Sequence, residues 1–259
     1  MNGIIELELG RLIAAYLFVV VLIGIVRARR IPREREITVA TLRMTVQLIL
    51  MGYVLGVVFE QRSLWLTLAI LVLMQTFAIF NIYGRVKEPL STSLKRIIAL
   101  AMAGGTTVTL LFFIFVVIHV APWYEPRYLV PIAGMLVGNS MTGVSLGVTR
   151  LVDGMKSRRD RVEAALMLGS TPRQASREII DNAFDSAILP TINSMVGMGI
   201  VFLPGMMTGQ ILSGVSPTTA IQYQIAIMLG IMGAVSLTVV VFVQLGFRTF
   251  FTHRAQLRS

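Results

Sequence analysis

The sequence predicts an all-α, polytopic membrane protein with about seven transmembrane helices. Three observations support this fold class. First, 55% of the 259 residues are apolar and only 14% are charged, and the mean hydropathy is +0.78, above that of ordinary soluble domains. Second, the apolar residues form runs long enough to cross a bilayer, which takes about 20 helical residues. Third, arginine and lysine concentrate in every second connection between these runs.

The apolar runs give the expected helices in chain order. The first run follows Glu6 and Glu8 and lacks the basic start and small-residue cleavage site of a signal peptide, so we expect a retained helix. We expect one membrane domain that covers residues 1–259. The seven runs are residues 9–26, 38–59, 64–83, 97–121, 129–149, 186–212 and 220–246.

The basic residues predict the orientation of these helices. Connections rich in arginine and lysine stay in the cytoplasm, so the N-terminus should lie outside and the C-terminus in the cytoplasm. The connection between the fifth and sixth spans, about residues 150–182, is then cytoplasmic. Its basic residues are Arg150, Lys156, Arg158, Arg159, Arg161, Arg173 and Arg177.

This connection has the pattern of a helical elbow. Apolar residues from Leu151 to Leu168 recur at roughly helical spacing, and charged residues fill the other positions, which predicts an amphipathic helix. Gly169 suits the left-handed residue that ends such a helix. Thr171, Pro172 and Gln174 then have the types and spacing of an N-cap, a first helical residue and a capping-box partner. We therefore expect a sharp turn.

Polar residues within the fifth and sixth predicted spans are candidates for a transport pathway. Asn139, Asn193 and Gln210 are costly to leave in hydrocarbon, so they should face the bundle interior or a cavity. Lining a pathway and bonding helices to one another are equally good explanations. Pro204-Gly205 should interrupt the sixth span, with Met206 and Met207 beside the break.

Composition excludes several kinds of chemistry. The chain has no cysteine, which excludes disulfides and thiolate metal sites, and no G-x-x-x-x-G-K-[ST] motif for nucleotide phosphates. We therefore expect no cofactor on this chain, no catalytic residues and no enzyme activity. The net charge of +10 is explained by topology and anionic lipid, so we expect a lipid bilayer as partner and no nucleic acid.

Glu163-Ala164-Ala165, followed after three residues by Gly169, is similar to the E-A-A-x-x-x-G signature of ABC-transporter permeases, which docks in a cleft of a partner ATPase. Four longer motifs resemble the FetB family of iron-export ABC permeases (UPF0014-like proteins). They are P-I-A-G-M at residues 131–135, G-N-S-M at 138–141, L-G-S-T-P-R-Q-A at 168–175 and L-P-G-M-M-T-G at 203–209.

The resemblance implies a transmembrane permease subunit in the inner (cytoplasmic) membrane that exports iron or a metal-related substrate. It implies a FetA-like ABC ATPase that carries ATP and Mg, and a homodimer of permeases in a 2+2 assembly. No metal ligand is assigned. One departure concerns spacing. In importer permeases an I-x-L-P run follows the E-A-A-x-x-x-G motif nine residues later, whereas here its counterpart, Ile188-Leu189-Pro190, comes much further on. The implied ATPase-docking residues are Glu163, Ala164, Ala165, Gly169, Ser170, Thr171, Pro172 and Gln174.

The alternative function is a secondary transporter or channel for a metal ion or small solute. Such a protein is expected to carry ionisable residues in the middle of its spans for coupling, and these spans have almost none. An intramembrane enzyme would need a nucleophile with a base, or a histidine and carboxylate metal set, and the sequence assembles neither. The pattern therefore favours the ABC permease.

Overall fold

The structure is a computed structural model that describes residues 8–86, 88–252 and 254–258. Every named element within these residues is a helix, which confirms the all-α prediction. The chain divides into two compact units: residues up to 63 with 212–214, and residues 64–211 with 215–259. The expectation of one membrane domain over residues 1–259 stays a prediction.

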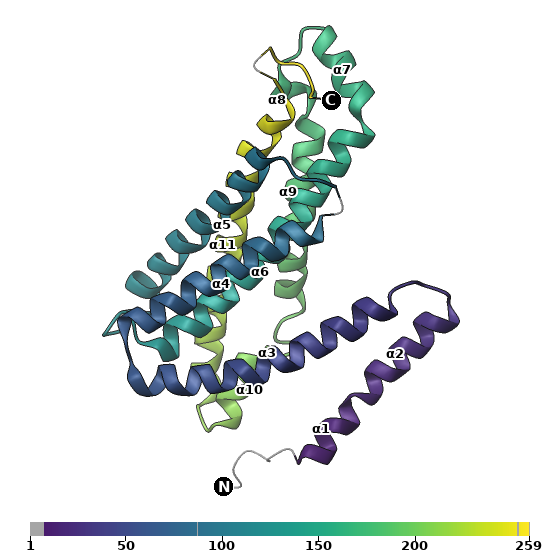
Figure 1. Ribbon diagram of the computed structural model, residues 1–259. Coiled ribbons are helices and arrows are strands. Elements are labelled where there is room, and N and C mark those ends of the chain that lie inside the picture. The colour runs from purple at the N-terminus through teal and green to yellow at the C-terminus, as the bar shows by residue number, and fades with distance from the viewer. Residues whose placement is uncertain (1–7, 87, 253, 259) are drawn as a thin grey trace. The chain divides into compact units, whose positions relative to one another are not determined.

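The first unit contains three helices, α1 (Leu9–Ala15), α2 (Leu17–Ala28) and α3 (Glu34–Gln61). The first two form one apolar stretch of 20 residues with a mean hydropathy of 2.5. A short loop reverses the chain between α2 and α3, so that these helices form a hairpin (Figure 1).

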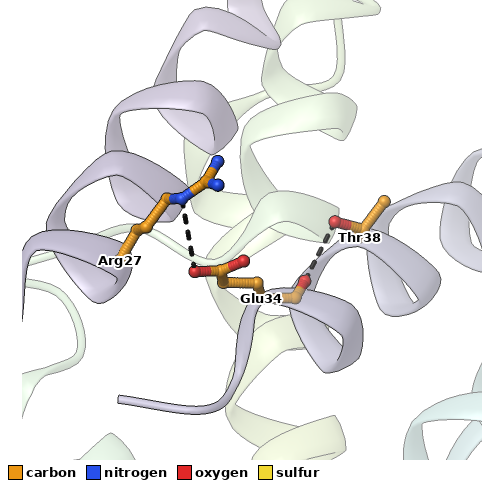
Figure 2. A network of polar contacts seen from close by, with 3 residues as sticks. All are labelled: Arg27, Glu34 and Thr38. Carbon is orange, nitrogen blue, oxygen red and sulfur yellow. Dashed lines mark hydrogen bonds and ion pairs between the residues drawn. The ribbon is translucent and has the colours of Figure 1, made fainter. Parts of the chain in front are cut away.

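Polar contacts close the loop end of this hairpin. Arg27 Nε lies 4.0 Å from Glu34 Oε1, and the hydroxyl of Thr38 donates to the backbone carbonyl of Glu34 at 2.9 Å (Figure 2). Further along the hairpin, the Tyr16 hydroxyl and Thr45 Oγ1 lie 2.6 Å apart in a hydrogen bond between the helices. The two helices are thus tied at two levels.

The second unit contains the other helices. Its long segments are α4 (Leu64–Arg85), α5 (Thr92–Phe112) with the π-helix η1 (Phe113–Ile118), α6 (Pro126–Ser157), α9 (Arg177–Gly197) and α11 (Pro217–Gly246) with the 3₁₀ helix η2 (Phe247–Phe250). Three short helices complete it: α7 (Arg159–Met167), α8 (Pro172–Ala175) and α10 (Gly205–Leu212). Figure 1 shows α7 and α8 at the end of this unit where the chain's C-terminus lies.

Helix α6 organises the core of the second unit. It packs against α4, α5, α9 and α11, and α11 in turn packs against α5 and α9. Leu136, Val144 and Leu151 of α6 are fully buried, as are Ile227 and Phe242 of α11. Such burial within a bundle of apolar helices fits a membrane protein, in which close side-chain packing holds the helices together.

Six helical segments of the described chain are long and apolar enough to cross a membrane: residues 9–28, 34–61, 64–85, 92–118, 126–157 and 217–250. They match six predicted spans. The remaining predicted span, 186–212, is not one helix, because α9 ends at Gly197 and α10 begins at Gly205. The seventh crossing and the orientation stay predictions.

Gly105 marks the close approach of α5 to α11, and a side chain there should destabilise the second unit. A Cβ atom on Gly105 would lie 2.9 Å from the Cα and 2.5 Å from the Oγ1 of Thr238, too close for any real contact. We expect Gly105→Val to reduce stability by about 1–3 kcal/mol, since backbone atoms cannot move aside cheaply. The measurement is the thermal unfolding midpoint of the purified protein in detergent.

Gly104 provides the matched control for this test. It lies next to Gly105 on the same helix but is exposed, and a Cβ atom there meets nothing within 4 Å. Gly104→Val therefore changes the same residue type without the clash. Equal losses of stability in the two variants would contradict the close packing of α5 on α11.

Candidate functional site

The elbow predicted at residues 150–182 is built from the end of α6, the short helices α7 and α8, and the start of α9. The predicted amphipathic helix is broken at Arg158, whose φ of −112° and ψ of 24° are not helical. Leu151 and Met155 are buried at the end of α6, and Val162 is buried on α7. The apolar face thus packs on protein on both sides of the break.

Gly169 ends α7 as predicted. Its φ is +89°, in the left-handed region that favours glycine. The N–H of Ser170 donates to the carbonyl of Ala165, and the N–H of Gly169 donates to that of Leu166, each at 3.0 Å. These two bonds form the Schellman motif, which satisfies the free carbonyls at a helix C-terminus.

Thr171 starts α8 with the capping box that the sequence predicts. Thr171 Oγ1 accepts the backbone N–H of Gln174 at 3.3 Å, and Gln174 Oε1 accepts the backbone N–H of Thr171 at 2.9 Å. Pro172 occupies the first helical position, where its missing N–H costs nothing. The elbow therefore has two defined helix ends only a few residues apart.

Ion pairs hold the elbow to its neighbours. The carboxylate of Glu178 on α9 pairs with the guanidinium groups of Arg158 and Arg161. Glu163, the first residue of the E-A-A motif, pairs with Arg159 one turn earlier at 2.8 Å. Individual exposed ion pairs stabilise little, but two that share one carboxylate constrain the angle between α7 and α9.

A further pair joins the end of α6 to the connection between α4 and α5. Lys156 Nζ donates to Glu88 Oε1 at 2.6 Å. The basic residues of this region thus partly serve the protein's own structure. Arg173 on α8 is exposed and makes no ion pair with another described residue, which leaves its charge available to a partner.

The tip of the elbow carries two exposed apolar residues that sequence reasoning missed. The side chains of Met167 and Leu168 are 86% and 88% exposed. The sequence pattern counted Leu168 with the apolar face of the amphipathic helix, whereas in the structure the chain leaves the helix at this residue. The sequence signal that could have identified both residues is their position directly before Gly169, where the helix ends. Among the other predicted docking residues, Ala164, Gly169, Thr171 and Gln174 are exposed, and Glu163, Ala165, Ser170 and Pro172 are half-buried.

Close packing of α6 on α9 sets the level of the predicted pathway residues. A Cβ atom on Gly143 would lie 3.1 Å from the carbonyl oxygen of Ala187, and one on Gly154 would lie 2.6 Å from Cγ2 of Ile179. The numbers of these facing positions sum to 330 and 333, as expected of antiparallel helices. Small residues allow such approach between membrane helices.

Asn139 and Asn193 lie at the same level of this helix pair, since their numbers sum to 332. Both side chains are exposed. Asn139 Nδ2 donates to the carbonyl of Met135 in its own helix at 2.8 Å. Asn193 makes no hydrogen bond through its side chain to another described residue. Within the described residues neither amide therefore joins two helices, and both lie open on the surface.

The break predicted in the sixth span is present, between Met198 and Pro204. Gly199 has a φ of +87°, and its N–H donates to the carbonyl of Phe202 at 3.0 Å, which closes a tight turn. Ile200 at the turn is 94% exposed. On the following helix Met207 is buried, whereas Met206 and Gln210 are half-buried.

The described residues contain no cluster of three or more histidine and carboxylate side chains that could hold a metal ion. The predicted pathway residues carry amide and thioether groups, which recognise by hydrogen bonding and soft contacts rather than by strong coordination of a hard cation.

A family model described as "Uncharacterised protein family (UPF0014)" matches residues 9–251 of this chain. The "Probable iron export permease protein FetB" of Escherichia coli (strain K12) is 32% identical over 243 residues, which are 94% of this chain and 92% of the relative. "Protein ALUMINUM SENSITIVE 3" of Arabidopsis thaliana is 35% identical over 253 residues, 96% of this chain and 90% of the relative.

A third relative, "UPF0014 membrane protein STAR2" of Oryza sativa subsp. japonica, is 36% identical over 248 residues, 95% of this chain and 85% of the relative. No solved structure matches the chain. The matches extend over nearly the whole length and cover both the elbow and the broken helix. With the six apolar helical segments, they make this a multi-pass membrane protein.

Proposed function

Since this chain belongs to the UPF0014 family, we propose that it is the permease subunit of an ABC transporter in the inner membrane, powered by a separate ATPase. The observation that carries the proposal is the elbow, whose tip exposes Met167 and Leu168 beyond a helix end fixed by Gly169. A rigid apolar projection of this kind suits insertion into a cleft of a partner protein.

The partner supplies ATP hydrolysis in this proposal. The chain has no Walker motif, and the name of the E. coli relative contains the word permease. The ATPase, of the FetA type, binds ATP and Mg and contacts the elbow residues from Glu163 to Gln174. Ion pairs from Glu178 to Arg158 and Arg161 transmit its movement to α9.

Two permease copies share one pathway in the proposed 2+2 assembly. The exposed amides of Asn139 and Asn193 support this arrangement, because amides cost several kcal/mol in lipid unless water or a partner satisfies them. A polar cavity between two copies would satisfy them. Met206, Met207 and Gln210, next to the broken helix, extend the same pathway.

The proposed cargo is iron or a metal-related substrate, leaving the cell. Support comes from the name of the E. coli relative, "Probable iron export permease protein FetB". Amide and thioether groups bind a bare hard cation poorly, so a chelated or conjugated metal fits the lining better. Transport assays should therefore show a preference for the metal complex over the free ion.

Gly169 substitutions test the proposal. A valine at a φ of +89° is strained by about 1 kcal/mol or more and should distort the Schellman turn, whereas asparagine tolerates this region. We expect Gly169→Val to lose binding to the ATPase and stimulation of its activity, and Gly169→Asn to retain most of both. Co-purification and ATP hydrolysis with the candidate ATPase provide the measurement.

The control is Gly104→Val, which adds the same side chain at an open helical position of the second unit. It should leave ATPase binding unchanged. Wild-type binding and hydrolysis in Gly169→Val would refute docking through the elbow and would favour a transporter that works without an ATPase.

A further inference from the structure

A groove between α2 and α3 in the first unit has no part in the proposed transport function. Its volume is about 410 Å³, and its lining includes Val20 and Ile23 of α2 and Thr41 and Leu42 of α3. It lies between the two cross-helix ties of the hairpin, the Arg27–Glu34 ion pair at the loop and the Tyr16–Thr45 hydrogen bond further along. Figure 2 shows the tie at the loop end.

The lining of the groove is apolar in effect although several of its residues carry hydroxyl groups. The hydroxyls of Thr38, Thr41 and Thr45 each donate to the backbone carbonyl four residues earlier, at 2.9 to 3.0 Å. The Tyr16 hydroxyl is bonded to Thr45. Since these polar groups already have partners, methyl and methylene groups face the groove, which suits a hydrocarbon chain.

The lining of the groove extends along α3 from Thr38 to Thr45, and the stretch of helix from the loop to the far end of the groove is as long as one half of a bilayer. From Glu34 to Thr45 the α3 helix rises about 16 Å, at 1.5 Å per residue. The hydrocarbon layer of a bilayer is about 30 Å thick, so one leaflet contributes roughly 15 Å. A single acyl chain that starts at the loop would therefore run along the groove and end near the Tyr16–Thr45 hydrogen bond.

The loop at the mouth of the groove is strongly basic. Residues 27–36 contain five arginines and two glutamates, a net charge of +3. Arg27 and Arg33 pair with those glutamates, whereas Arg29, Arg30 and Arg35 make no ion pair with another described residue. Three exposed guanidinium groups thus stand free at the loop end of the hairpin, where they can bind a phosphate.

Arg30 occupies a position that favours glycine. Its φ is +53°, and the N–H of Ile31 donates to the carbonyl of Val26 at 3.0 Å, so Arg30 is the left-handed residue of a Schellman turn. A bulky side chain in this conformation is strained. The loop thus keeps a charged residue at a position where glycine would be accommodated without strain.

We propose that the α2–α3 hairpin binds an anionic phospholipid, with its phosphate at Arg29 and Arg30 and one acyl chain in the groove. The apolar groove suits an acyl chain, and the free arginines suit a negatively charged head group. The lipid thereby anchors the first unit in the leaflet next to the basic loop.

The test uses the purified full chain in detergent, with palmitoyl-oleoyl phosphatidylglycerol as the probe. Phosphatidylcholine with the same chains controls for charge, and glycerol 3-phosphate controls for the head group alone. Native mass spectrometry counts the bound lipid, and the thermal unfolding midpoint reports its effect. We expect phosphatidylglycerol to bind about fivefold more tightly than phosphatidylcholine and to raise the unfolding midpoint further. Glycerol 3-phosphate should neither bind nor raise the midpoint.

Two variants separate the parts of the site. Arg30→Gly removes a charge and relieves the strain, so without lipid it should be at least as stable as the wild type while binding phosphatidylglycerol about fivefold more weakly. Leu42→Trp fills the groove and should also lose the lipid. The matched controls are Arg96→Gln, an exposed arginine of α5, and Leu50→Trp, an exposed residue of α3 outside the groove.

Three results would overturn the proposal. The first is equal binding of phosphatidylglycerol and phosphatidylcholine, which indicates only bulk lipid. The second is equal stabilisation by glycerol phosphate, which indicates a site for a free anion. The third is lipid binding that Leu42→Trp leaves unchanged, which shows that the acyl chain lies elsewhere. A shift in oligomeric state in the same variant would then indicate that the groove takes a helix of another chain.

Discussion

Replacing Met167 and Leu168 together by glutamate is expected to weaken binding of the partner ATPase by about two orders of magnitude or more. Each side chain is nearly fully exposed in this chain, so in a docked complex each would bury most of its surface. Full burial of one such side chain contributes about 1.5–3 kcal/mol, and 1.4 kcal/mol changes an affinity tenfold. The measurement is the dissociation constant for the purified ATPase.

The fold should tolerate this double substitution. Neither side chain packs on the core, and the Schellman bonds at Gly169 involve backbone atoms alone. The control exchanges the two residues, Met167→Leu with Leu168→Met, which keeps an apolar tip of similar volume and should retain binding. A glutamate variant with normal thermal unfolding and normal affinity would show that the tip lies outside the docking surface.

Substitution of both Asn139 and Asn193 by leucine is expected to abolish transport while leaving the membrane level and ATPase binding intact. The two exposed amides lie at one level of the α6–α9 pair, and neither bonds to a second helix in the part of the chain that the structure describes. Their removal therefore costs the chain little packing but removes the polar lining of the proposed pathway. The measurement is the metal content of iron-loaded cells with and without the variant.

Two controls accompany this experiment. Asn139→Gln with Asn193→Gln keeps the amide groups and should retain part of the activity. Gln47→Leu removes an exposed amide from α3 in the first unit and should leave transport unchanged. Undiminished export by the double leucine variant would mean that these amides do not line the pathway.

Local features of the elbow could be predicted from the sequence because they depend on neighbouring residues. Gly169 and the Thr171–Gln174 capping box form their bonds within a few positions, so residue type and spacing are sufficient. The break at Arg158 and the shared contacts of Glu178 could not be predicted, because they depend on how α7 and α9 meet in space.

The helices, too, could be predicted where they depend on local sequence and not where they depend on contacts in space. Hydropathy identified six segments correctly, since crossing a bilayer requires a long apolar run. It gave the second half of α9, the turn and α10 as one span, because the turn residues around Ile200 are as apolar as a helix would be; only the interruption at Pro204-Gly205 was predicted within it. The common level of Asn139 and Asn193 requires the contacts of Gly143 and Gly154 with α9, which no pattern in the sequence specifies.

A photo-crosslinking amino acid at Leu168 tests the central claim most directly, because this side chain is 88% exposed at the tip of the elbow. In living cells we expect it to capture a polypeptide whose sequence, read by mass spectrometry, contains the G-x-x-x-x-G-K-[ST] motif of an ATPase. The same amino acid at Trp65, exposed at the start of α4, should not capture that polypeptide. Capture of the ATPase at both positions, or at neither, would contradict docking through the elbow.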